Sequence, residues 1–140
     1  MGLRAVSLLA LSALVSSSAC VDVGDPWYAE KPLTVVPDGP ISFQEHVQPI
    51  LRAHDCDVCH SGERPRAGVD VSTADSFFDS SVISACDPDN SVVILQVEAC
   101  LMPPSDAPGG PVCLDEAELT ILRQWIAEGA EAVYHPDTCP

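Results

Sequence analysis

Positively charged side chains are scarce in this 140-residue chain, which has 6 Lys and Arg against 21 Asp and Glu. Binding to a phosphate backbone needs clustered Lys and Arg, so the composition disfavours a nucleic-acid partner. Two roles for the acidic surface are equally consistent with this composition. It keeps the protein soluble, or it steers a basic partner protein toward it.

Long apolar runs are also lacking. The only candidate, residues 5–15, is shorter than the roughly 20 residues that span a bilayer. It follows the basic residue Arg4 and precedes the small residues 16–19, an order typical of an export signal. We therefore expect residues 1–19 to be a signal peptide, the mature chain to have no membrane helix, and the protein to work outside the cytoplasm.

Cys20 follows these small residues directly and resembles the lipidated cysteine in the lipobox of bacterial lipoproteins. The Leu usual three places earlier is replaced by Ser17. The resemblance implies a lipid anchor at Cys20, as the only membrane attachment, on the periplasmic face of a bacterial membrane, with the outer membrane as one option. Ordinary cleavage nearby, which leaves a soluble protein, is the alternative.

Residues 20–40 are rich in Pro, Gly and acidic residues, and we expect a flexible tether there. The folded domain is expected to be residues 41–140. Its apolar spacing predicts an all-α domain of three to five short helices.

The helix predicted from Ser42 has the form of a capping box with Glu45, and Pro49 should kink it. A short helix is expected within residues 72–81, capped by Ser72 or Thr73.

Two helices are expected further along the chain. Residues 90–99 fit a helix capped by Asn90, although their β-branched residues also fit a strand. The clearest helix begins at the cap Asp115, with Glu118 three residues later, and ends at Gly129.

The segment Cys56-Asp57-Val58-Cys59-His60 has the Cys-x-x-Cys-His pattern of covalent haem attachment. Two thiols one helical turn apart can add to the two vinyl groups of one porphyrin, and the adjacent imidazole then lies under the iron. A zinc site would need further ligands, and a thioredoxin-like redox pair would need a βαβ setting, which the sequence does not indicate. A simple disulfide role would leave His60 without a function.

Met102 is the candidate for the opposite axial ligand of the iron. It is the only Met after the proposed signal peptide, and it precedes two prolines that restrict its backbone. The competing interpretation is a methionine that fills the core. Among the histidines, His135 is the rival ligand, whereas His46 and His54 are expected to be solvated at the surface. We expect the ring of His60 to donate to a carbonyl, with Pro65 as a candidate.

Three segments together resemble a small bacterial class I cytochrome c domain, most similar to those of planctomycete and myxobacterial lipoproteins. They are FQEHVQPILRAHDCDVCHSG, DPDNSVVILQVEACLMPP and GGPVCLDEAELTILRQWIAEGA. The resemblance implies one covalent haem c, with thioether links at Cys56 and Cys59 and axial ligands His60 and Met102. It also implies packing of the first helix against the last, through residues Phe43, Val47, Leu122, Trp125 and Ile126. The haem would supply much of the buried surface of so small a core.

Seven cysteines are many for an exported chain of this size. With Cys20 lipidated and two thiols on haem, four remain, an even number that allows three disulfide pairings. We favour Cys100 with Cys113, which closes the loop that holds Met102, and Cys86 with Cys139.

The leading hypothesis is a mono-haem electron carrier that is not an enzyme and exchanges one electron at a time with a redox partner protein. The first alternative is a haem enzyme or gas sensor, which needs an open or labile sixth position on the iron. The second is a disulfide-stapled surface lipoprotein without haem.

Overall fold

A computed structural model describes residues 34–107 and 112–139 of the chain. The predicted signal peptide, Cys20 and the tether up to residue 33 lie outside this range. Residues 34–42 form no helix or strand, and Ile41 near the end of this stretch is the first buried core residue of the described part. The described part contains helices and no strand, so the prediction of an all-α domain is confirmed.

The first helical segment is divided in two, the π-helix η2 (Phe43–Val47) and the α-helix α1 (Gln48–Ala53). The Ser42 hydroxyl accepts from the Glu45 amide, as predicted, whereas the Ser42 amide donates to the His46 ring. Pro49 lacks an N–H and its ring would collide with the Glu45 carbonyl of a regular helix. The wider turn of η2, in which the Gln48 amide donates to the Phe43 carbonyl, lies just before this proline.

The chain turns sharply between α1 and the next helix, α2 (Cys56–Cys59). Asp55 adopts a left-handed backbone conformation with φ 53°, which Asp tolerates better than most residues. Asp55 is thus the N-cap of α2 and follows His54, the C-cap of α1.

The middle of the chain holds the 3₁₀ helix η3 (Arg66–Gly68), α3 (Ala74–Asp79), the 3₁₀ helix η4 (Pro88–Asn90) and α4 (Val92–Glu98). Thr73 caps α3 through a capping box with Ser76. The preference for helix over strand at α4 is correct, but the cap expected at Asn90 is wrong. Asn90 ends η4, and the N-cap is Ser91, whose buried hydroxyl donates to the Asp87 carbonyl.

The last helix, α5 (Glu116–Ala127), has the predicted capping box between Asp115 and Glu118. Gly129 follows its end with φ 110°, a conformation that side chains disfavour. A Cβ there would also lie only 2.6 Å from the Thr138 side chain. Both the backbone conformation and the close approach of Thr138 therefore require glycine at this position.

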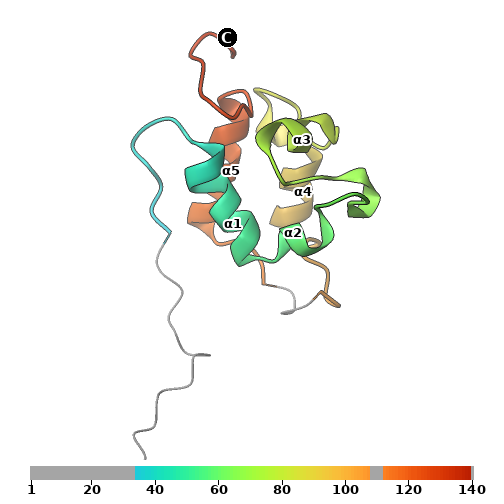
Figure 1. Cartoon of the computed structure of the whole chain (residues 1–140). Helices are drawn as coiled ribbons and strands as arrows, with labels where there is room; N and C mark the ends of the chain where they lie inside the picture. Colours follow the sequence, from blue (N-terminus) through green and yellow to red (C-terminus); the bar gives the residue numbers. More distant parts are fainter. Residues whose placement is uncertain (1–33, 108–111, 140) are drawn as a thin grey trace, which may run out of the picture. The chain divides into compact units, whose positions relative to one another are not determined.

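The first helical segment packs against the last one through η2, which contacts α5, in the part of the domain where Figure 1 labels α1 and α5. The ring of Trp125 lies 5.3 Å from that of Phe43 and 5.9 Å from that of Phe77, measured between centroids. Its indole N–H donates to the Glu131 carbonyl, so the polar end of this buried residue is satisfied. The core around these rings joins α5 to η2 and α3.

Two disulfides cross-link the domain, with the pairing favoured from the sequence. Cys86 is bonded to Cys139 and Cys100 to Cys113. The first joins the turn before η4 to the C-terminal segment. The second joins the end of α4 to the residues that precede α5.

Candidate functional site

Helix α2 presents the Cys-x-x-Cys-His motif at one wall of the domain. Its single turn separates Cys56 from Cys59, and the His60 amide donates to the Cys56 carbonyl at 2.9 Å. Both thiols are free, whereas the other four cysteines of the described residues form disulfides. The pairing therefore leaves unbonded the two thiols that the motif requires.

The His60 ring is oriented by a hydrogen bond to the backbone. Its Nδ1 lies 3.3 Å from the Val69 carbonyl, which can only accept, so Nδ1 is the donor. The expected acceptor Pro65 is wrong, because its carbonyl accepts instead from the Gly68 amide. The tight turn of η3 and the Val71 amide, which donates to the His60 carbonyl at 2.8 Å, bring Val69 to the ring. With Nδ1 donating, the Nε2 lone pair is available to a metal.

Met102 lies on the loop between α4 and α5. The amides of Leu101 and Met102 both donate to the Gln96 carbonyl, at 2.9 and 3.3 Å, and so fix the start of this loop to α4. The Met102 side chain is half-buried against the core.

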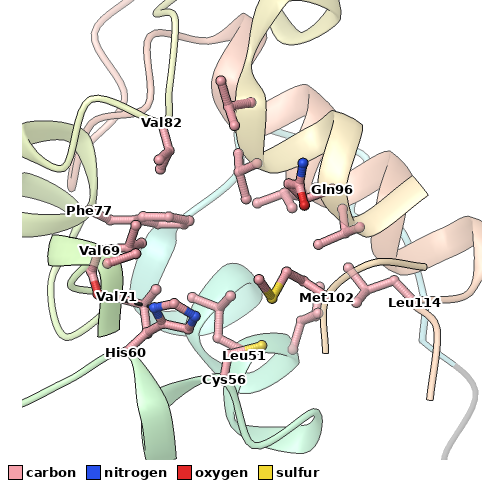
Figure 2. A pocket seen from close by; sticks show the side chains of 16 residues that line it. Leu51, Cys56, His60, Val69, Val71, Phe77, Val82, Gln96, Met102 and Leu114 are labelled. Atoms are coloured by element: carbon pink, nitrogen blue, oxygen red, sulfur yellow. Dashed lines mark hydrogen bonds between the residues drawn. The ribbon is translucent and has the colours of Figure 1, made fainter. Parts of the chain in front are cut away.

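One apolar cavity brings these residues together. It holds about 880 Å³, including the space at its open mouth. Figure 2 shows the side chains of Cys56, His60 and Met102 directed into it, with Phe77 and Val82 farther along its wall. Its lining is aliphatic and aromatic apart from those three side chains and Gln96: Ile50, Leu51, Ala67, Val69, Val71, Phe77, Val82, Val92, Val93, Val97, Leu114 and Leu122.

A second, smaller cavity adjoins the motif. Cys56, Cys59, His60 and Met102 all line it, together with the two prolines after Met102. Cys56, Cys59, His60 and Met102, the haem ligands and attachment points expected from the sequence, thus lie at two neighbouring cavities. Met102 is there although it is 42 positions from His60 in the chain.

These residues suit a covalent haem. The walls of the cavity are apolar, as a porphyrin face requires. A nitrogen and a thioether sulfur enter it from segments far apart in sequence, and two free thiols stand at one side. His60 and Met102 would hold the iron, while Cys56 and Cys59 would hold the porphyrin edge.

The environment of Cys56 does not favour a reactive thiolate. Burial, followed by the negative charge of Asp57, raises the pKa of this thiol from 9.0 to about 11. Redox-active and metal-binding cysteines have the opposite property, a lowered pKa beside positive charge or a helix N-terminus. The thioredoxin-like alternative is therefore disfavoured by the surroundings of Cys56.

Among residues 34–107 and 112–139, no three His, Cys, Asp or Glu side chains are grouped so that they could hold a metal ion. In the same part of the chain, no helix has the length and apolar character needed to cross a membrane.

The expectation that His54 is a surface residue is wrong. Its side chain is 1% exposed and lies against the equally buried Glu118, with Nε2 2.9 Å from a carboxylate oxygen. His54 and Glu118 are 64 positions apart, so only the tertiary fold reveals this pair. The one signal in the sequence is Glu118 itself, whose spacing from Asp115 indicates a helix cap and gives no sign of a histidine partner.

The other two histidines are not at the cavity. His46 is partly buried, and its Nδ1 accepts from the Ser42 amide at 2.9 Å, so it is not simply solvated as expected. His135, the rival to Met102, has a side chain that is 67% exposed and lies 3.8 Å from Glu131, outside the lining of the cavity. Met102 is thus better placed than His135 to face His60.

Comparison of the chain with protein-family models, with curated proteins and with solved structures gave no match in any of the three.

Proposed function

We propose that this protein is a mono-haem c-type cytochrome of the class I type that transfers single electrons outside the cytoplasm. It is an electron carrier and not an enzyme. The proposal rests chiefly on one observation, that Cys56, His60 and Met102 line the same apolar cavity. A methionine that only fills the core could lie anywhere in it, whereas Met102 comes from a distant loop and lines the cavity that Cys56 and His60 also line.

Bound haem c supplies the one-electron chemistry of its iron, and the chain supplies the setting. His60 and Met102 would both hold its iron, which would leave no place on the metal for a substrate. A thioether ligand and an apolar surrounding both favour the reduced state and raise the reduction potential. The thiols of Cys56 and Cys59 would hold the group by adding S–H across its vinyl double bonds, an attachment that would release no atom and need no oxidant.

The acidic composition supports a basic redox partner, because opposite charge accelerates encounter without requiring a large interface. We place the protein at the periplasmic face of a bacterial membrane, held by lipid on Cys20. Nucleic acid is not a partner.

Covalent attachment is tested by the mass of the exported protein made together with haem-attachment enzymes. After denaturation the wild-type chain should keep the added mass and colour of one haem. The double variant Cys56→Ser/Cys59→Ser should lose both, whereas the matched variant Cys86→Ser/Cys139→Ser should keep them. A colourless, unmodified wild-type chain would contradict the proposal and leave the stapled lipoprotein without haem.

Axial ligation is tested by absorption spectra of the oxidised and reduced protein. The wild type should be six-coordinate and low-spin, and Met102→Ala should become high-spin or accept added imidazole readily. Leu101→Ala is the control, because this neighbour is 57% exposed and does not line the cavity. A high-spin wild type would favour the haem enzyme or gas sensor instead.

A further inference from the structure

A buried polar pair lies immediately before the Cys-x-x-Cys-His motif. His54 caps the end of α1, and its ring is enclosed between α1, the start of α5 and the residue Val112. Nδ1 is 3.0 Å from the Val112 carbonyl, and Nε2 is 2.9 Å from Glu118 Oε2. Ionisable side chains are seldom buried this completely unless they are paired.

Hydrogen-bond chemistry fixes the direction of one bond and limits the other. The Val112 carbonyl can only accept, so Nδ1 carries a proton. The second bond holds one proton between Nε2 and the carboxylate. The same carboxylate oxygen accepts from the Asp115 amide at 2.9 Å. Glu118 is thus held by the α5 N-terminus on one side and by His54 on the other.

These bonds fasten the loop that carries Met102. The start of the loop is attached to α4 through the Gln96 carbonyl, and the Cys100–Cys113 disulfide closes the loop on itself. Neither connection sets the distance from the loop to the Cys-x-x-Cys-His segment. His54 does so, because it bonds Val112, next to Cys113, and is separated from Cys56 by a single residue. Its own carbonyl lies 3.9 Å from the Cys56 sulfur.

We propose that His54 is a positioning residue for axial ligation, which holds the far end of the Met102 loop against the haem-bearing segment. This inference rests on the proposed function. His54 does not touch the cavity; it acts through Val112 and Glu118. Without it, Val112 and the neighbouring Cys100–Cys113 disulfide would no longer be fixed to the segment before Cys56, and Met102 would hold the iron less often.

The test uses the haem-loaded protein and added imidazole, which binds ferric iron only when Met102 is displaced. Apparent affinity for such a ligand scales with the population of the open state. His54→Leu should increase imidazole affinity about tenfold or more and weaken the charge-transfer band of Met-ligated ferric haem. His54→Gln can still donate to the Val112 carbonyl and should lie between wild type and His54→Leu.

His46→Leu is the matched control, since it also removes a histidine bonded to the backbone, but at the opposite end of the first helical segment. It should lower stability without changing imidazole affinity. If His54→Leu does not accumulate, His54→Gln and Glu118→Gln decide, and wild-type imidazole affinity in both overturns the proposal. An equal increase in His46→Leu also overturns it, because general destabilisation would then explain the effect.

Failure of this inference is distinguishable from failure of the proposed function. Covalent haem with Met102 bound in every His54 and Glu118 variant refutes the positioning role alone. Absence of covalent haem from the wild type refutes the cytochrome itself.

Discussion

The two segments that face each other across the cavity are held in different ways. His60 lies within a local structure, in which its amide bonds Cys56, its ring bonds Val69 and its carbonyl bonds Val71. Met102 has one local bond, from its amide to the Gln96 carbonyl, and otherwise depends on distant connections, through the Cys100–Cys113 disulfide and the contact of Val112 with His54. The segment that holds His60 should therefore keep its structure after perturbations that release the loop of Met102.

The helical core beneath both segments should show the largest effect on stability. Trp125→Ala removes a fully buried ring that contacts Phe43 and Phe77 and also its hydrogen bond to the Glu131 carbonyl. Truncations of this kind cost about 3–5 kcal/mol, so the free energy of unfolding should fall by that amount. Urea unfolding followed by circular dichroism measures it.

Trp125 belongs to neither segment, so its loss should weaken both equally. Hydrogen exchange should accelerate alike at the His60 and Met102 amides in Trp125→Ala. Faster exchange at only one of them would show that the crossing of the first and last helices supports one side of the cavity selectively.

The two disulfides offer the sharpest comparison. The closed loops span 53 positions for Cys86–Cys139 and 13 for Cys100–Cys113. Loop-closure entropy predicts losses of about 4 and about 3 kcal/mol when each pair is replaced by Ser. The larger stability loss should thus come from Cys86→Ser/Cys139→Ser, as urea unfolding would show.

The two disulfides should rank in the opposite order when imidazole binding at the site is measured instead of stability. Cys100→Ser/Cys113→Ser opens the Met102 loop and should increase imidazole binding more than Cys86→Ser/Cys139→Ser does. If both pairs change imidazole affinity equally, the distal loop is not held by its own cross-link, and the distinction between the two segments fails.

The last prediction concerns the Cys56 thiol in the haem-free protein and needs no perturbation of the fold. Because burial raises the pKa of Cys56 from 9.0 to about 11, its thiolate fraction at neutral pH is about 100-fold lower than in the unfolded chain. Alkylation of Cys56 by iodoacetamide should be slower by about the same factor, as mass spectrometry of the modified peptide would show.

The same pKa shift has a consequence for stability. Between pH 9.0 and about 11 the unfolded chain has lost the Cys56 proton while the folded chain retains it. The stability present below pH 9 should therefore decline as the pH rises through this range. Cys56→Ala should lack this part of the decline; an unchanged slope would show that Cys56 is more accessible than its burial indicates.

Local patterns predicted much of the fold and part of the site. The cap Asp115 and the glycine at 129 are predictable because each acts within a few positions along the chain, and the same local pattern narrows the cap of α3 to Ser72 or Thr73, of which the structure has Thr73. The disulfide pairing followed from counting the cysteines that other roles left over and from the position of Met102 in the chain.

The failures share a physical cause, dependence on contacts between distant residues. Nothing near His54 indicates burial, because its partner Glu118 belongs to another helix. Asn90 has the side chain of a helix cap, but the preceding 3₁₀ turn shifts the start of α4 by one residue. The carbonyl that accepts from the His60 ring belongs to Val69, and the turn at η3 puts it there. The amino-acid composition of this loop does not predict the course of its backbone.

The free state of Cys56 and Cys59 beside two disulfides has a consequence for how the chain is made. Six cysteines in one oxidising compartment can pair fully in fifteen ways. If the chain is exported and takes haem as proposed, maturation would have to oxidise four of them and keep the remaining two reduced until porphyrin arrives. Folding of the helices before oxidation would achieve this selection, because it brings the correct sulfurs together and shields the Cys56 thiol. Assembly of this small domain would thus depend on the order of two reactions of sulfur, the oxidation of four thiols to disulfides and the addition of two reduced thiols to the porphyrin.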